Sequence, residues 1–131
     1  MNLTRKLYRF EGSVLRDMYD WYDMPIAILQ RTANDIVRFE NCTGTRKAPT
    51  VKSGTVLSYN QGDVIRLKRN HRNLMVLLHE LAHWFQGERG QVHGQAFLRR
   101  YVDLLTVYAG LNREELLFAF AMEGIYIKER C

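Results

Sequence analysis

Three of the chain's four histidines lie within fifteen positions of one another, in the stretch LLHELAHWFQGERGQVHGQAF, which runs from Leu77 to Phe97. Two of them, His79 and His83, are four residues apart. On a helix this spacing places two side chains on the same face, one turn apart. Two such imidazoles can share one Zn²⁺ at about 2.0–2.1 Å each. The H-E-x-x-H pattern therefore predicts two ligands of a metal site on one helix.

Glu80 directly follows the first of these histidines, so it lies next to the helix face that would hold the metal. It is not a natural ligand there, but it can take a proton from a zinc-bound water and pass it to a leaving group. We therefore expect Glu80 to be a general base. Five-residue matches of this kind also occur by accident in ordinary helices. A functional site is favoured here by the apolar residues on the other side of the helix, Leu77, Leu78, Leu81 and Phe85.

A catalytic zinc site normally has three protein ligands and one water. His93 follows His83 by ten residues, and the segment between them contains Gly87 and Gly90. Gly87 can end the helix, and the loop can then turn the chain back toward the metal. We expect His93 to be the third ligand and Gly94 to open the next helix.

Roughly the first forty residues are expected to be helical. Apolar spacing predicts one helix over Thr4–Trp21, with a short strand over residues 5–10 as the alternative. A second helix is expected next, with Asp23 as its cap, Pro25 in its first turn and an apolar stripe of Ile26, Leu29, Ala33, Ile36 and Val37.

Strands are expected next. Glycines and alternating β-branched residues predict strands in GTVLSY and DVIRLK, joined by the turn NQGD, and a shorter strand in APTVKS. After the H-E-x-x-H helix, the sequence predicts a helix that Gly110 ends and another that Asn112 and Glu115 cap. Gly124 is expected to stop that last helix, and the tripeptide IYI is expected to add a terminal strand.

This order predicts an α+β fold: a single zincin-like domain over residues 1–131, in which a small antiparallel sheet packs with the H-E-x-x-H helix and further helices. The length of 131 residues fits one domain, and 47% hydrophobic with 25% charged residues is typical of a globular chain. No apolar run reaches the roughly eighteen residues that span a bilayer. Because no signal-peptide pattern is present, we expect a cytoplasmic protein. Cys42 and Cys131 are far apart in sequence and predict no disulfide framework.

Positive charge is concentrated between Arg46 and Arg72. Seven arginines and lysines stand there against Asp63 alone, while the whole chain has a net charge of +5. A basic segment of this kind favours an anionic partner, and single-stranded DNA is the one we expect. The alternative is that these residues are solvated loop and strand positions.

The stretch "LLHELAHWF…GQVHGQAFLRRYVDLL" resembles the zincin metallopeptidases related to SprT and Spartan, and is more similar still to small H-E-x-x-H metallopeptidases of phages and actinobacteria. Upstream, SGTVLSYNQGDVIRL and TRKLYRFE are similar to the strands and the N-terminal segment of those proteins. The resemblance implies His79, His83 and His93 as Zn²⁺ ligands, Glu80 as catalytic base, and Tyr59 as a catalytic residue on the strand along which a substrate peptide would lie.

The chain departs from the family at several points. Gln95 stands where the family has a proline, the loop before the third histidine is shorter than in Spartan, and no zinc-ribbon or DNA-binding domain follows in this sequence. If DNA is bound, we expect this domain to bind it. Related gluzincins take the third ligand from a glutamate on a later helix, for which Glu114, Glu115 and Glu123 are the candidates.

These observations predict a zinc-dependent endopeptidase that acts on protein or peptide substrates, including proteins associated with DNA, and that does not enter a membrane. Tyr59, Tyr101 and His71 are the candidates for stabilising the oxyanion, although His71 is otherwise expected at the surface. One alternative is a basic nucleic-acid-binding protein on a zincin fold with little or no protease activity. Another is a structural zinc domain, against which Glu80 argues because a closed structural site needs no neighbouring base.

Overall fold

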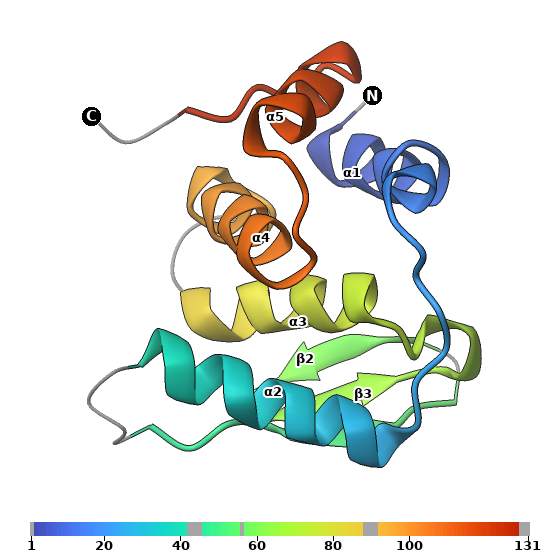
Figure 1. Ribbon diagram of the computed structural model, residues 1–131, viewed down its shortest axis with the longest axis vertical. Helices are drawn as coiled ribbons and strands as arrows, with labels where there is room; N and C mark the ends of the chain where they lie inside the picture. Colours follow the sequence, from blue (N-terminus) through green and yellow to red (C-terminus); the bar gives the residue numbers. More distant parts are fainter. Residues whose placement is uncertain (1, 42–45, 56, 88–91, 129–131) are drawn as a thin grey trace. The chain divides into compact units, whose positions relative to one another are not determined.

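Helices predominate in the computed structural model, which describes residues 2–41, 46–55, 57–87 and 92–128 (Figure 1). The described part contains five α-helices and one three-stranded sheet, so the predicted α+β class is confirmed. The chain divides into two compact units, one of residues 1–21 with 88–131 and one of residues 22–87. The zincin-like packing and the single domain stay predictions. The expectations for Cys42, Val56, Gly90 and Cys131 fall outside the described residues.

In the unit of residues 22–87, helix α2 (Ile26–Glu40) begins directly after Pro25, which was expected inside its first turn. Pro25 is itself the N-cap, and its carbonyl accepts hydrogen bonds from the amides of Ile28 and Leu29 at 3.0 Å each. The prediction that Asp23 caps this helix is wrong, because a capping side chain acts from the N-cap position and Asp23 lies two residues before it. The expected apolar stripe is buried at Leu29, Ala33, Ile36 and Val37.

The sheet consists of β1 (Thr50–Ser53), β2 (Tyr59–Gln61) and β3 (Val64–Leu67), in the order β1-β3-β2. β2 and β3 form the expected antiparallel hairpin, but β1 pairs with β3 in parallel, so the prediction of an antiparallel sheet is wrong. The chain reverses between β1 and β2 and again between β2 and β3. Two reversals restore the direction of β1, and β3 then lies between the other two strands.

The first of these reversals shortens the strand predicted in GTVLSY. A Cβ added at Gly54 would lie 2.9 Å from the carbonyl oxygen of Leu57, so the chain folds back on itself there. Of the described residues among GTVLSY (54, 55 and 57–59), only Tyr59 belongs to β2. The second reversal is the tight turn at Gly62, where φ is 57°. The side-chain amide of Gln30 on α2 bonds to the backbone of the first strand, since its Oε1 accepts from the amide of Val51 at 2.6 Å.

Helix α3 (Leu74–Gln86) carries the H-E-x-x-H residues and contacts α2, β2 and β3. Asn73 caps its start by accepting a hydrogen bond from the amide of Val76 at 3.0 Å. It ends at Gly87, as predicted, where φ is 71°. His79 and Glu80 are buried, as are Leu77, Leu78 and Leu81 of the same helix. His83 and Phe85 are half-buried.

In the unit of residues 1–21 and 88–131, helix α1 (Leu3–Ser13) replaces the first half of the helix predicted over Thr4–Trp21, and a 3₁₀ helix, η1 (Leu15–Met18), follows it. The alternative of a strand over residues 5–10 is therefore wrong. Trp21 lies beyond both helices, and its indole Nε1 donates a hydrogen bond to the carbonyl of Leu15 at 2.9 Å.

Helices α4 (Gln95–Tyr108) and α5 (Arg113–Met122) follow, and their signals are confirmed: Gly94 is the N-cap of α4 and the side chain of Asn112 caps α5. The tripeptide IYI forms no strand with any described residue, so that prediction is wrong. Instead, the side-chain amide of Gln95 donates to the carbonyl of Tyr126 at 2.7 Å and accepts from the amide of Lys128 at 2.8 Å. The Gln95 side chain thus makes, with the backbone of residues 126 and 128, hydrogen bonds of the kind that a neighbouring strand would make.

Candidate metal centre

Helix α3 directs the imidazoles of His79 and His83 at each other. Their Nε2 atoms are 3.2 Å apart, and their ring centroids are 5.0 Å apart. Two nitrogen ligands of a tetrahedral zinc ion, each at 2.0–2.1 Å, lie about 3.3–3.4 Å apart. The two rings are therefore already at the separation that a shared ion requires. Without an ion, the same contact is a hydrogen bond from one Nε2–H to the other Nε2.

His93 lies just before the N-cap of α4 and is 6% exposed. Its Nδ1 is 3.0 Å from the hydroxyl oxygen of Thr4 on α1. Two aromatic rings meet it edge-on: that of Tyr8 at a centroid distance of 5.7 Å and that of Phe97 at 5.0 Å. A hydrogen bond and two ring contacts therefore fix the orientation of the imidazole, all within one unit of the chain.

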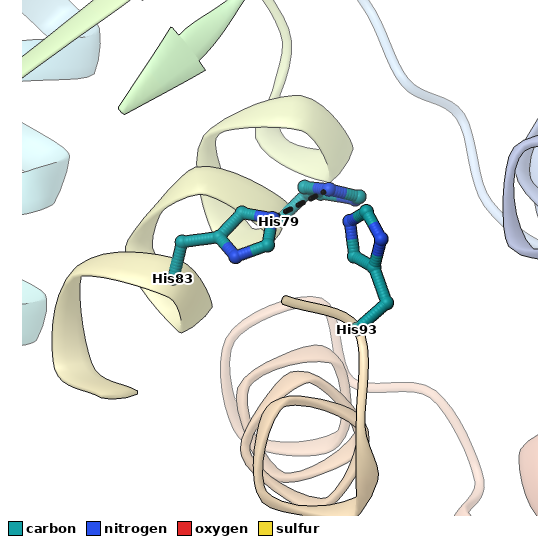
Figure 2. A group of neighbouring side chains, drawn as sticks. All are labelled: His79, His83 and His93. Atoms are coloured by element: carbon teal, nitrogen blue, oxygen red, sulfur yellow. Dashed lines mark hydrogen bonds between the residues drawn. The ribbon is translucent and has the colours of Figure 1, made fainter. Parts of the chain in front are cut away.

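The three predicted ligands group together. One ring nitrogen from each of His79, His83 and His93 lies within 4.8 Å of those of the other two, and Figure 2 shows the three side chains. This group could hold a metal ion. Imidazole donors suit zinc, copper, iron and nickel alike, so the donor set alone would not select among these metals.

Glu80 is 6% exposed and follows His79 on α3. Among the described residues, the possible ligand group contains the three histidines and no carboxylate. The role of Glu80 as a general base stays a prediction. A buried carboxylate beside a cation-binding group is suited to moving a proton.

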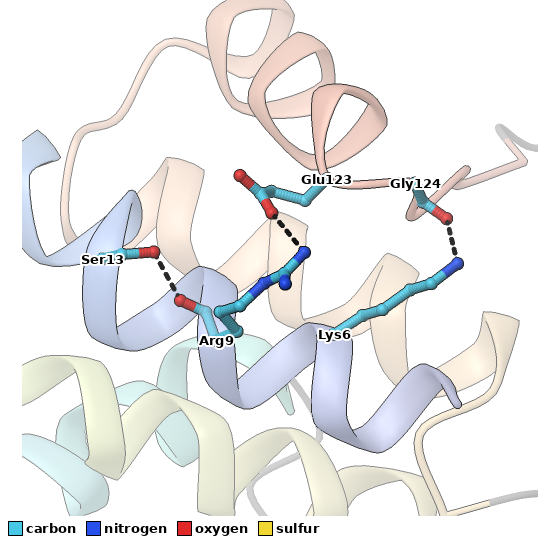
Figure 3. A network of polar contacts seen from close by, with 5 residues as sticks. All are labelled: Lys6, Arg9, Ser13, Glu123 and Gly124. Carbon is cyan, nitrogen blue, oxygen red and sulfur yellow. Dashed lines mark hydrogen bonds and ion pairs between the residues drawn. The ribbon is translucent and has the colours of Figure 1, made fainter. Parts of the chain in front are cut away.

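The glutamates considered as alternative third ligands are engaged elsewhere or exposed. Glu123, just after α5, pairs with Arg9 on α1 through an Nη2–Oε2 distance of 3.4 Å (Figure 3). Glu114 and Glu115 lie in the exposed first turn of α5. The described part of the chain therefore favours His93 over a glutamate.

Tyr59 lies on the edge strand β2 and is 39% exposed. It is directly opposite Arg66, whereas its neighbour Asn60 is opposite the fully buried Ile65. Because side chains alternate between the faces of a sheet, the Tyr59 side chain points to the exposed face, away from the buried face that contacts α3.

The other two candidates for an oxyanion donor have partners of their own. Tyr101 is fully buried in α4, and its hydroxyl donates to a carboxylate oxygen of Glu11 at 2.5 Å. His71 is half-buried, and its Nδ1 is 2.9 Å from the hydroxyl oxygen of Ser58. That hydroxyl accepts a hydrogen bond from the amide of Lys68.

Sequence reasoning missed Thr4 and Tyr8, which both contact His93. Their spacing of four residues places them on one face of α1, and this is the only signal that the sequence offers. Nothing in the sequence connects that face to a residue 89 positions further along the chain.

Comparisons of the chain with protein-family models, with curated proteins and with solved structures give no match. The resemblance to SprT-like metallopeptidases therefore stays a prediction. Within the described residues, no helix is long and apolar enough to cross a membrane.

Proposed function

We propose that the chain is a zinc-dependent endopeptidase with His79, His83 and His93 as its metal ligands. The observation that carries this proposal is the 3.2 Å approach of the Nε2 atoms of His79 and His83 on a helix that also contains the buried Glu80. A purely structural zinc site would be expected to close with a fourth protein ligand. The described ligand group has three members, which suits an open position for a substrate or water.

Zinc at such a site supplies a Lewis acid, which polarises a peptide carbonyl and lowers the pKa of water toward about 7. Glu80 takes a proton from the attacking water and delivers it to the nitrogen of the leaving amine. The burial of Glu80 keeps bulk water from competing for that proton. An oxyanion donor is also needed. The Tyr101 hydroxyl is donated to Glu11 and the Tyr59 side chain points to the exposed face of the sheet, which leaves His71 among the three candidates.

The substrate peptide adds as a further strand at the edge formed by β2. β3 pairs with one side of β2, and no described strand pairs with the other. Leu57 and Tyr59 are 65% and 39% exposed beside this edge. The other edge of the sheet is less accessible, because Gln30 bonds to the β1 backbone there. β2 also contacts α3, the helix that carries Glu80.

The test is Glu80→Gln, assayed for zinc content and for hydrolysis of casein. The amide keeps the shape of the side chain but cannot accept the proton, so zinc should stay bound while hydrolysis falls by roughly 10²–10⁴-fold. Glu115→Gln, at an exposed position of α5, is the matched control and should retain the parent activity. A Glu80→Gln variant that hydrolyses casein as fast as the parent would refute the proposal.

A second candidate function is the binding of single-stranded nucleic acid, and the register of the sheet favours it. Lys52, Arg66 and Tyr59 lie side by side in one row across the three strands, on the exposed face. Lys68 follows Arg66 by two positions, which directs it to the same face. Cations that bind phosphates beside an aromatic ring that stacks on a base are typical of single-strand binding. Not all of the basic segment is available, since Arg46 stacks on the Trp84 ring at 3.7 Å.

A further inference from the structure

We propose that Thr4 is a positioning residue for His93: its hydroxyl oxygen accepts a hydrogen bond from Nδ1–H and thereby leaves Nε2 as the atom that binds the metal. This inference rests on the proposed metal site. It concerns atoms of one unit of the chain, residues 1–21 with 88–131, and the contact that carries it is the 3.0 Å distance between Oγ1 of Thr4 and Nδ1 of His93.

A neutral imidazole carries one proton on two nitrogens, so that one nitrogen donates and the other accepts. Only the unprotonated nitrogen can bind a metal. A hydroxyl can act as donor or acceptor, and it therefore fits either tautomer geometrically. When Thr4 accepts, Nδ1 holds the proton and the lone pair lies on Nε2. Metal-binding histidines commonly donate their second ring N–H in this way, which fixes the tautomer and the orientation of the ring.

The position of Thr4 in α1 makes its hydroxyl available for this contact. Helix interiors usually bind a threonine hydroxyl to a carbonyl one turn back, as the hydroxyls of Thr32 and Thr106 do with the carbonyls of Ile28 and Val102 at 2.8 and 2.7 Å. Thr4 lies in the first turn of α1, whose N-cap is Asn2, so no helical turn precedes it. Its hydroxyl contacts His93 instead. Because Thr4 is only half-buried, water can accept the hydroxyl proton.

The surrounding aromatic contacts hold the plane of the imidazole. Tyr8, one turn after Thr4 on α1, meets the His93 ring at an interplanar angle of 78°, and Phe97, one turn into α4, meets it at 77°. Both aromatic rings are therefore nearly perpendicular to the imidazole ring and pack against it. With the plane held by the aromatic rings, the hydroxyl of Thr4 decides which nitrogen carries the proton.

The experiment compares Thr4→Val, which keeps the shape and removes the hydroxyl, with Thr4→Ser, which restores the hydroxyl. Thr106→Val removes a hydroxyl from the same unit without contacting His93 and is the matched control. In the metal-free parent, ¹⁵N-resolved NMR should show His93 protonated on Nδ1. Zinc affinity should fall by roughly 10–100-fold in Thr4→Val, the usual effect of losing such a partner. It should be near the parent value in Thr4→Ser and Thr106→Val.

Two results would overturn the inference: protonation of Nε2 in the metal-free parent, or a Thr4→Val variant that binds zinc as tightly as the parent. The NMR measurement needs neither metal nor substrate, and it decides the inference even if Thr4→Val does not fold. It also separates the two proposals. A parent protein with an Nδ1-protonated His93 and no peptidase activity would refute the proposed function while leaving the role of Thr4 intact.

Discussion

His79 and His83 are four positions apart, and α3 converts that spacing into an Nε2–Nε2 distance of 3.2 Å. The spacing alone does not ensure this, because each imidazole can rotate about two bonds. Burial restricts the rotation of His79, which is 4% exposed. His93 is restricted in another way, by Thr4, Tyr8 and Phe97. Each of these side chains is thus held near one orientation, which would reduce the entropy lost on binding a metal.

Replacing the third ligand should separate the histidine arrangement from the glutamate alternative. His93→Ala should lower zinc affinity by more than the roughly 10–100-fold expected for a residue that only supports a ligand. Glu123→Ala should leave the affinity unchanged, because Glu123 pairs with Arg9 in a partly exposed contact. Competition with a chromophoric chelator measures both values. The reverse ranking would point to a gluzincin-like site.

Among the elements, the candidate site depends most on helix α3 and on the residues at its two ends. Asn73 fixes its start, and Gly87 ends it one turn after His83. At Gly87, φ is 71° and ψ is −151°, a combination that is almost confined to glycine. Among the described residues, no atom would meet a Cβ at this position, so the argument for glycine here is its backbone conformation.

The substitution Gly87→Ala should therefore lower the free energy of unfolding by about 1–3 kcal/mol, the usual range for a residue held in such a conformation. Gly12→Ala is the matched control: Gly12 lies inside α1, and a Cβ there also meets no atom. Alanine should stabilise that helix by about 0.5–1 kcal/mol. Chemical denaturation followed by circular dichroism gives both values. Equal effects of the same sign would show that backbone conformation does not limit Gly87.

Much of this element structure could be predicted from short-range signals. Gly87 predicts the end of α3, Gly94 predicts the start of α4, and Asn112 predicts the cap of α5. Each of these signals acts within one turn of its own helix. Asp23 failed as a cap because a proline nearer to the helix took that position.

Long-range relations were less accessible to sequence reasoning. The parallel pairing of β1 with β3 depends on which strand lies in the centre, and this is not encoded in the local pattern. The candidate site shows both outcomes. The sequence predicted the three histidines that group together. It did not predict the Thr4 contact, nor that register would turn the Tyr59 side chain to the exposed face.

At the scale of the whole chain, the net charge of +5 is concentrated in one segment, and part of that segment lies on the exposed face of the sheet. If single-stranded DNA binds there, each phosphate contact should contribute roughly 0.7 log unit of affinity per tenfold change in salt. The double variant Lys52→Ser and Arg66→Ser should therefore lower the salt slope by about 1.4.

The matched control is the double variant Arg31→Ser and Arg38→Ser, which removes the same charge from exposed positions of α2. It should leave the salt slope nearly unchanged. Fluorescence anisotropy with a labelled oligonucleotide measures both variants. Equal slopes for the two variants, or no binding by the parent at low salt and roughly tens of micromolar protein, would exclude the sheet face as a nucleic-acid site.

The metal content of protein purified without chelators tests the central claim most directly. Elemental analysis after extensive dialysis should find one zinc per chain in the parent and almost none in the double variant His79→Ala and His83→Ala, because that variant removes both nitrogens of the 3.2 Å pair. Circular dichroism should confirm that the variant retains its helices. A folded parent without stoichiometric zinc, or a variant that binds as much zinc as the parent, would contradict the assignment of these histidines as a zinc centre.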